Sequence, residues 1–308
     1  MTIAIHKPVM LNEVLDCFHV EPNNLYLDAT FGRGGHTKEI LKLGGSVVAF
    51  DQDLEAVEFA HQEFSKQIED GQLTIIHSNF DDLEKQTKHL PVGQADAAIF
   101  TGILFDFGTS QDQIRAPQRG FSFDRLDSPL DMRMNQELSV TASDLLAVLT
   151  KKQLEKMFIE LGGENRIVAK KVACAIDRYR KPDRSNRVET VGELVGIVEK
   201  YQHRHSRLHP ATKIFQALRI AVNSELECIK VALPQAFKLL KNSGKIITIA
   251  FHQGEDVIIK HQFSDWEKEK LGEIIFNKPL KPSLEEIQKN PSSRSAKLRA
   301  FKKSRHET

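Results

Sequence analysis

The stretch LYLDATFGRGGHTKEILKLGGSVVAFDQD, residues 25–53, determines the fold that we expect for this chain. It begins with a short apolar run ending at Asp28, which is typical of a buried strand. A helix with Thr37 as its N-cap and a second strand over residues 46–50 follow. Asp51 then stands at the carboxyl end of the second strand, where nucleotide-binding folds hold an acid for a ribose diol. The glycines of the turn between strand and helix are Gly32, Gly34 and Gly35.

The spacing of these glycines leaves three interpretations open. A dinucleotide fingerprint that starts at Gly32 needs a glycine at position 37, where this chain has Thr37. S-adenosylmethionine carries no phosphate, and its amino acid part needs only a close backbone approach, which Gly34 and Gly35 allow. The pattern therefore favours the methyl donor over a dinucleotide. An ordinary turn between strand and helix, without a ligand, is the third interpretation.

The composition describes a globular chain whose charges nearly cancel. Its 308 residues are 40% hydrophobic, which suffices for two domains or for one with a large insertion. Lys and Arg total 43 against 42 for Asp and Glu, so net charge does not indicate a nucleic acid partner. The cysteines are widely spaced without a CxxC pair, and His203, His205 and His209 have no nearby carboxylate or cysteine, so we expect no metal site. A reduced, cytoplasmic compartment fits, and no apolar run predicts a membrane span.

Candidate ligand-binding residues follow the ends of two further predicted strands. Phe80 comes just after the strand predicted over residues 73–78 and is a candidate for packing on an adenine ring, although a lone aromatic is more often core. Asp106 ends an apolar run that contains a fourth strand. A buried carboxylate is costly without partners, so we expect Asp106 to face the ligand cleft. The alternative is that it caps the following turn through Thr109 or Ser110.

A change of pattern in the middle of the chain predicts an inserted domain. Residues 111–135 show neither strand nor helix periodicity for most of their length, and their Phe and Met residues indicate an ordered, functional loop. Residues 139–200 are typical of a series of helices. We therefore expect an α/β fold with a Rossmann-like methyltransferase sheet, discontinuous over residues 1–112 and 209–308. An all-helical domain for substrate recognition, residues 113–208, is inserted between the two parts.

The C-terminal part completes the α/β domain in this interpretation. Residues 209–233 predict one long helix that returns to the domain, with Pro210 in its first turn. A strand over residues 245–251 follows, and His252 and Asp256 come at its carboxyl edge. Alternating apolar and basic residues in NPSSRSAKLRAFKK predict an edge strand with its cations outward.

Segments along nearly the whole chain match one known pattern. They are HKPVMLNEVL, DATFGRGGHT, FDFG, RGFSFDRLDSPLDMRMN, HPATKIFQALRIAVNSEL, the FH and ED of FHQGED, and NPSSRSAKLR. Together they resemble the bacterial 16S ribosomal RNA cytosine N4-methyltransferase family, RsmH or MraW. The resemblance implies an S-adenosylmethionine-dependent enzyme that methylates the exocyclic amine of the cytidine at position 1402 of 16S rRNA, in the 30S small ribosomal subunit.

The resemblance also implies a set of cofactor contacts. Carried over position by position, they are Gly34, Gly35, His36, Asp51, Phe80, Asp106 and Gln113. Of these, His36 and Gln113 rest on the resemblance alone. The chain departs from the family at Gln111 and Asp112, where a serine and a proline are usual, so the conformation of that loop is open. FHQGED replaces the usual FHSLED, and NPSSRSAKLR lacks one arginine of the more common NPRARSAKLR.

The chemistry of the implied reaction assigns a role to Asp106. Cytosine N4 is a poor nucleophile because its lone pair is delocalised into the ring, so an acceptor for the amine protons must assist. Asp106, with the main-chain carbonyl of Phe107, is our candidate for that catalytic acceptor. Extruding the base from folded RNA costs a few kcal/mol, which stacking and backbone contacts must offset. Residues expected to contact RNA are Arg115, Arg119, Phe121, Phe123, Arg133, Lys213, Arg219, Arg294 and Arg299.

Two other classes of function stay open. A dinucleotide-dependent oxidoreductase would need the missing third glycine, and a nicotinamide absorbance assay would detect it. An RNA-binding protein with a vestigial cofactor fold is the other, suggested by the altered loop at Gln111 and Asp112. The retained carboxylates Asp51 and Asp106 argue against it.

Overall fold

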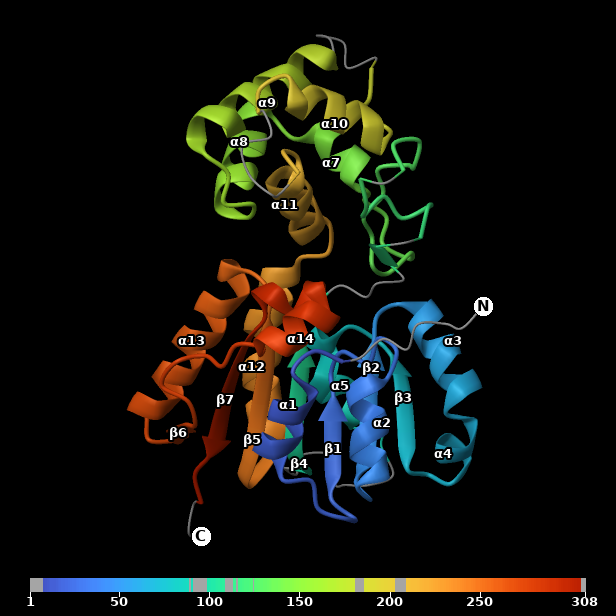
Figure 1. The fold of residues 1–308 in the computed structure, drawn as a ribbon, viewed down its shortest axis with the longest axis vertical. Helices are drawn as coiled ribbons and strands as arrows, with labels where there is room; N and C mark the ends of the chain where they lie inside the picture. Colours follow the sequence, from blue (N-terminus) through green and yellow to red (C-terminus); the bar gives the residue numbers. More distant parts are fainter. Residues whose placement is uncertain are drawn as a thin grey trace. The chain divides into compact units, whose positions relative to one another are not determined.

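The chain forms two compact units, which are described separately. The computed structural model describes residues 8–88, 90, 99–108, 113–114, 116–123, 125–180, 186–202 and 209–305. One unit comprises Met1–Gly108 and Leu226–Thr308, and the other Thr109–Glu225. The first is an α/β unit and the second is helical (Figure 1). Within the described ranges, no helix combines the length and the apolar character that crossing a membrane requires.

A seven-stranded sheet forms the centre of the α/β unit, in the order β3-β2-β1-β4-β5-β7-β6. Its strands are β1 (Leu25–Asp28), β2 (Ser46–Asp51), β3 (Leu73–His77), β4 (Phe100–Asp106), β5 (Leu240–Ala250), β6 (Gly272–Ile274) and β7 (Lys297–Lys303). Strands β1 to β5 pair in parallel, whereas β7 pairs antiparallel with β5 and β6. The strand order reverses between β1 and β4, and open α/β sheets bind ligands at the carboxyl ends of such strands. The predicted Rossmann-like α/β class is confirmed.

Helices cover both faces of this sheet because successive strand residues point to opposite sides. In β2, Val47 packs in one core cluster with Val14 of α1 and Ile40 of α2, and Val48 packs in the other with Leu233 of α12. The helices are α1 (Leu11–Phe18), α2 (Gly35–Lys42), α3 (Leu54–Glu63), α4 (Ser65–Glu69), α5 (Leu83–Thr87), α12 (Glu225–Leu239), α13 (Gln253–Lys268) and α14 (Leu284–Lys289), with the 3-10 helices η1 (Phe80–Asp82) and η2 (Pro291–Ser295).

The helical unit packs around a core of its own. Its helices are α7 (Ala142–Val148), α8 (Lys151–Glu160), α9 (Arg166–Tyr179), α10 (Val191–Glu199) and α11 (Thr212–Val222). Thr141, Thr150 and Thr190 begin α7, α8 and α10 with capping boxes, which satisfy backbone N–H groups that a helix start leaves open. The apolar faces of the helices meet in a single buried cluster.

The boundaries of the helical unit differ from the predicted residues 113–208. Helix α11 belongs to this unit, since Ile214 and Leu218 pack in the same buried cluster as Phe158 of α8. The chain enters the α/β unit again only at Leu226. The single long helix predicted over residues 209–233 is two helices, because Ser224 has a φ of 50° and interrupts the α-helical backbone.

The prediction that the last strand is an edge strand is wrong. β7 lies between β5 and β6, because Ile274 of the short strand β6 pairs with Phe301. The prediction that the cationic side chains of β7 point outward also needs correction for two of them. Lys297 and Arg299 both bind the carboxylate of Asp256 at the start of α13.

Candidate functional site

Carboxylates end three adjacent strands at the carboxyl edge of the sheet. Asp28 is the last residue of β1, Asp51 of β2 and Asp106 of β4, and β1 lies between the other two strands. Asp28 is fully buried, and the other two are half-buried. In the part of the chain that the structure describes, neither Lys nor Arg pairs with any of them. This edge is therefore anionic and suited to a cationic ligand.

The glycine turn after β1 leaves space for a ligand near Asp51. Gly32 and Gly34 have φ values of 56° and 66°, in the left-handed region that favours glycine. A Cβ on Gly34 would lie 2.6 Å from the ring of Phe31, so a side chain does not fit there. A Cβ on Gly32 would meet no heavy atom within 4 Å. The N–H of Gly32 donates to Oδ2 of Asp51 over 2.7 Å, which ties the turn to the end of β2.

Two threonines link the strand ends through hydrogen bonds that sequence reasoning did not predict. Thr37 is not the N-cap of α2, which begins at Gly35 after the left-handed Gly34. Its hydroxyl instead donates to Oδ2 of the buried Asp28 over 2.7 Å. Thr30 donates its N–H to Oδ1 of Asp28 and accepts the N–H of Asp106 over 2.7 Å. These hydrogen bonds connect the end of β1 to α2 and to the end of β4, and so fix the positions of these three segments relative to one another.

The environment of Asp106 allows its carboxyl group to exchange a proton near neutral pH. Burial raises the pKa of Asp106 to about 6, against the opposing effects of His36 and of the N–H of Gly108. Negative charge on Asp28 and Glu255 raises this pKa further. Gly108 donates to Oδ1 of Asp106 over 3.2 Å. The alternative caps for this turn, Thr109 and Ser110, lie outside the described residues.

His36 sits at the start of α2, where its ring is buried. Its Nε2 lies 3.0 Å from the carbonyl oxygen of Val9, which fixes the ring against the segment before α1. The family resemblance alone predicted this residue, and the structure brings it close enough to Asp106 to lower the pKa of that carboxyl group.

Phe80 lies in η1, directly after β3, on a loop that α12 holds in place. Its ring packs edge-on against Phe105 and Phe107, with centroids 5.9 Å and 5.6 Å away. The side chain of Gln235 donates to the carbonyl of Asp81 and accepts the N–H of Glu84 over 2.8 Å. Sequence reasoning missed Gln235, because about 150 positions separate it from the loop that it holds.

Three arginines that we predicted to bind RNA have hydrogen-bond acceptors within the helical unit. Arg119 is 2% exposed and donates to the carbonyl of Met134 over 3.0 Å. Arg133 binds Asp131 through two nitrogens, at 2.8 Å and 2.7 Å. Arg219 likewise forms a two-nitrogen ion pair, both bonds at 2.9 Å, with Glu225. The structure thus gives these guanidinium groups acceptors within their own unit.

The other predicted contact residues are distributed over both units. Phe121 and Phe123 pack on the helical core, and the Phe123 ring stacks on His209 with centroids 4.4 Å apart. Lys213 lies 3.8 Å from the carboxylate of Glu164 and is half exposed. Gln113 is a buried residue of the helical unit, and Arg115 lies outside the described residues. In the α/β unit, Arg294 is exposed and Arg299 binds Asp256.

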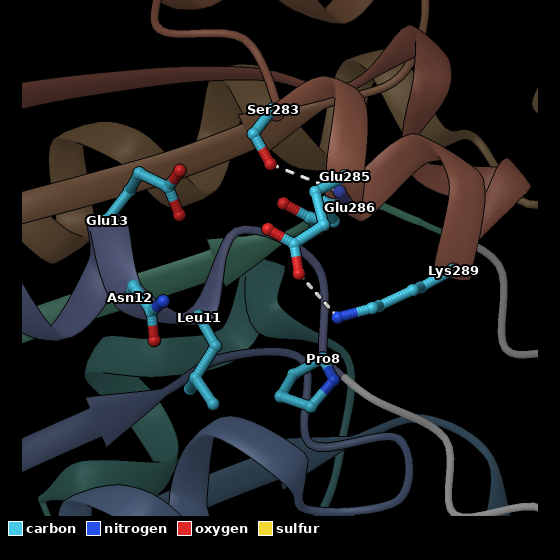
Figure 2. Close-up of a pocket in the computed structure, with 8 residues that line it drawn as sticks. All are labelled: Pro8, Leu11, Asn12, Glu13, Ser283, Glu285, Glu286 and Lys289. Atoms are coloured by element: carbon cyan, nitrogen blue, oxygen red, sulfur yellow. Dashed lines mark hydrogen bonds and ion pairs between the residues drawn. The ribbon is translucent and has the colours of Figure 1, made fainter.

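A small polar cavity lies beside α1 and α14 (Figure 2). Its volume is about 140 Å³, and its lining consists of Pro8, Leu11, Asn12, Glu13, Ser283, Glu285, Glu286 and Lys289. An ion pair between Lys289 and Glu285 lies at its rim. None of the strand-end carboxylates lines this cavity, and we assign it no role in the site.

The strand-end residues fit S-adenosylmethionine. The ammonium and sulfonium groups of that molecule are cationic, and the three carboxylates have no Lys or Arg partner among the described residues. Asp51 offers acceptor oxygens for a ribose diol, and the open space over Gly32 lets a ligand approach the backbone.

Comparison with known proteins identifies the family. The model of the MraW methylase family matches residues 3–304. Ribosomal RNA small subunit methyltransferase H of Coprothermobacter proteolyticus is 41% identical over 300 residues, or 97% of this chain and 96% of that protein. The protein of the same name from Dictyoglomus thermophilum is 39% identical over 299 residues, or 96% of each. A solved structure of a putative rRNA-methylase from Clostridium thermocellum aligns over 98% of this chain and 99% of that chain, with 12% identity and a TM-score of 0.45. The chain therefore belongs to the MraW methylase family, and it is a methyltransferase that uses S-adenosylmethionine.

Proposed function

We propose that this protein transfers a methyl group to N4 of the cytidine at position 1402 of 16S rRNA, in the small ribosomal subunit in the cytoplasm. The observation that carries the proposal is the half-buried Asp106 at the end of β4, with two further strand-end carboxylates beside it. Two relatives, each named ribosomal RNA small subunit methyltransferase H, support the substrate class.

The residues of the site divide the work of this reaction. S-adenosylmethionine supplies an electrophilic methyl group on a good leaving group. Asp106 accepts a hydrogen bond from the exocyclic amine, which makes the nitrogen lone pair available, and takes the proton that N4 releases as its bond to the methyl carbon forms. Gly108 and Thr30 orient Asp106 through the hydrogen bonds described above. Asp51 would bind the ribose hydroxyls of the cofactor, and Phe80 would pack against its adenine.

The test is methylation of small-subunit RNA by the purified protein with labelled S-adenosylmethionine. Naked 16S rRNA and 30S particles, both built from unmodified transcripts, serve as substrates, and nucleosides are then analysed and the modified position mapped. We expect N4-methylcytidine at position 1402. Cofactor binding without transfer to either substrate would favour the RNA-binding protein with a vestigial cofactor fold.

Removing the Asp51 carboxylate should weaken binding of the cofactor. The Asp51→Ala variant loses an acceptor for the ribose hydroxyls, and hydrogen bonds to charged groups contribute roughly 1.5 to 3 kcal/mol. We therefore expect the dissociation constant of S-adenosylmethionine, measured by titration calorimetry, to rise about ten- to a hundredfold. Asp70→Ala, at an exposed position after α4, is the matched control. An unchanged affinity in Asp51→Ala would remove the ribose assignment.

Affinity for the cofactor should depend on pH between about 4 and 6. Burial raises the pKa of Asp28, Asp51 and Asp106 from 3.8 to about 6 in the cofactor-free protein. In this window the folded protein binds more protons than the unfolded chain, so its free energy of unfolding decreases as pH rises. A bound cation favours the ionised carboxylates and lowers these pKa values.

We therefore expect S-adenosylmethionine to bind more tightly at pH 7.5 than at pH 5, with protons released on binding near pH 6. Calorimetry in two buffers of different ionisation enthalpy measures both quantities. An affinity that stays constant from pH 5 to 7.5 would show that these carboxylates do not face the cationic groups of the cofactor.

A further inference from the structure

The outer surface of the helix pair α8 and α9 carries cations that the structure of the helical unit does not use. The two helices pack side by side (Figure 1). In α9, Ala169, Val172, Ala173 and Ile176 form the buried stripe. Two exposed cations of the pair have acceptors on their own helix: Lys156 pairs with Glu160, and Nε of Arg178 donates to the carbonyl of Cys174. The other five exposed cations are Lys151, Lys152, Arg166, Lys170 and Lys171. We call these five residues the α8–α9 basic face.

Helix periodicity places the α9 members of this face together. At 100° per residue, Arg166, Lys170 and Lys171 fall within about 140° of one another. Arg166 lies beside the buried stripe, about 20° from Ala173, and Lys171 lies nearly opposite it. Asp177 lies on the same side as Arg166 and Lys170, but its carboxylate pairs with Arg180 over 2.9 Å. The positive charge of the α9 surface is therefore not neutralised by the acid of its own helix.

Local stability does not explain these cations. The N-terminus of a helix carries partial positive charge, so Lys and Arg are unfavourable in the first turn. Lys151 and Lys152 nevertheless open α8, Arg166 opens α9, and neither helix has an acid in its first turn. Arg166 and Lys170 are also a like-charge pair four residues apart, which destabilises a helix. Residues that break a local rule without a compensating contact are expected at functional positions.

Several exposed lysines of the α/β unit form ion pairs with acids three residues away, as in Lys42 with Glu39, Lys230 with Glu227 and Lys268 with Asp265. Within the described ranges, no carboxylate pairs with any member of the α8–α9 basic face. Meanwhile Arg119, Arg133 and Arg219, three of the arginines that the sequence suggested for RNA, have acceptors within the helical unit.

We propose that the α8–α9 basic face binds the phosphate backbone of the ribosomal RNA substrate. The inference rests on the proposed function, since it takes RNA as the substrate. Phosphates are the partner of matching charge, and contacts of Lys and Arg with them add affinity without reading sequence. This surface holds the RNA, whereas recognition of the target cytidine belongs to other residues.

The first test is the double variant Lys170→Ala/Lys171→Ala, with binding of naked 16S rRNA measured over a range of salt concentrations. Each phosphate contact contributes about 0.7 to 0.9 to the slope of log K against log salt. We expect a slope smaller by about 1.5 and RNA binding weaker by about tenfold or more at 0.1 M salt. The control is Lys230→Ala/Lys238→Ala on α12, which removes the same charge from exposed, paired lysines and should change binding less than twofold.

A second variant separates a binding role from a structural one. Arg166→Glu puts an acid in the first turn of α9, where it is favourable, so thermal stability should not fall while RNA affinity falls. Affinity for S-adenosylmethionine should be unchanged in every variant, whether or not the protein methylates position 1402.

Two results would overturn the proposal. One is wild-type RNA affinity and salt slope in Lys170→Ala/Lys171→Ala. The other is weaker binding to 30S particles with unchanged binding to naked RNA, which would assign the face to an acidic ribosomal protein. If only the methylation assay failed, that would count against the proposed function. The measured effect of the lysine variants on RNA binding would still support the role of the α8–α9 basic face.

Discussion

The Asp106→Asn variant should bind S-adenosylmethionine and transfer almost no methyl group. The amide oxygen of asparagine still accepts the N–H of Gly108, so the turn after β4 keeps its geometry. The amide cannot take a proton from the amine of cytosine, and loss of a general base typically costs about 10²- to 10⁴-fold in rate. The measurement is the single-turnover rate with unmodified 30S particles, at cofactor concentrations that saturate the variant.

Because Asp106 also influences cofactor affinity, the rate is measured with the enzyme saturated by S-adenosylmethionine, so that it reports on the chemical step. The cofactor dissociation constant is measured in parallel by calorimetry, so a binding defect is not mistaken for a catalytic one. Asp82→Asn is the matched control, since that carboxylate lies close to Phe80 in η1, is 47% exposed and pairs only with Lys85 among the described residues. A rate within threefold of wild type in Asp106→Asn would remove this residue from the mechanism.

The pH dependence of the same rate supplies an independent check. Burial raises the pKa of Asp106 to about 6 in the cofactor-free protein, and the cofactor cation lowers it, so in the complex Asp106 is ionised at pH 7.5 and takes up its proton below pH 6. The wild-type rate should therefore fall on the acid side of pH 6, and the residual rate of Asp106→Asn should lack this decrease.

The centre of the fold was predictable because its signals are local. Each inner strand is an apolar run, and Asp28, Asp51 and Asp106 mark the places where three of these runs end. Once the strands are parallel neighbours, their carboxyl ends must meet at one edge. The anionic cluster thus follows from strand ends and topology.

The boundary between the two units and the order of the last strands depend on tertiary packing, which a local sequence pattern does not predict. The apolar stripe of α11, with Ile214 and Leu218, has the same period whichever unit it packs on, and only the structure shows that it joins the helical core. The place of β7 depends on its pairing with β6, a strand of three residues, and no local pattern shows which strands pair.

The roles of the arginines were unpredictable for a related reason. A sequence shows where a guanidinium group is but not which acceptors surround it. The acceptors of Arg119 are main-chain carbonyls 14 and 15 positions away, and Asp256 is 43 positions from Arg299. Sequence reasoning therefore could not show that several cations predicted to contact RNA also have acceptors within the fold.

Replacing Asp256 should destabilise the α/β unit strongly. Its Oδ1 binds Nε of Arg299 over 2.7 Å and its Oδ2 binds Nζ of Lys297 over 2.9 Å, which joins α13 to β7. Burial alone would raise the pKa of Asp256, but the hydrogen bonds from these two cations outweigh it and hold the pKa below its usual value. Asp256→Ala leaves Arg299, 11% exposed, without its acid. Breaking a buried pair in this way costs about 3 to 5 kcal/mol.

Urea unfolding followed by tryptophan fluorescence measures this cost. The protein has 1 Trp, Trp266, which is buried on α13 and reports on the unit that contains Asp256. We expect the low end of the range, near 3 kcal/mol, because Lys297 is 31% exposed and can be hydrated in the variant. Asp265→Ala on the same helix, whose partner Lys268 is 72% exposed, should change stability by less than about 0.5 kcal/mol.

Two further observations decide whether an uncompensated cation causes the loss. The double variant Asp256→Ala/Arg299→Met replaces the charged pair with apolar groups, so it should recover much of the stability that Asp256→Ala loses. The difference between wild type and Asp256→Ala should also shrink as pH falls below the ordinary pKa of 3.8, since a carboxyl with a lowered folded-state pKa loses its stabilising effect there. A double variant less stable than the single one would show that Arg299 contributes mainly through packing against its neighbours in the sheet, and that its charge matters little.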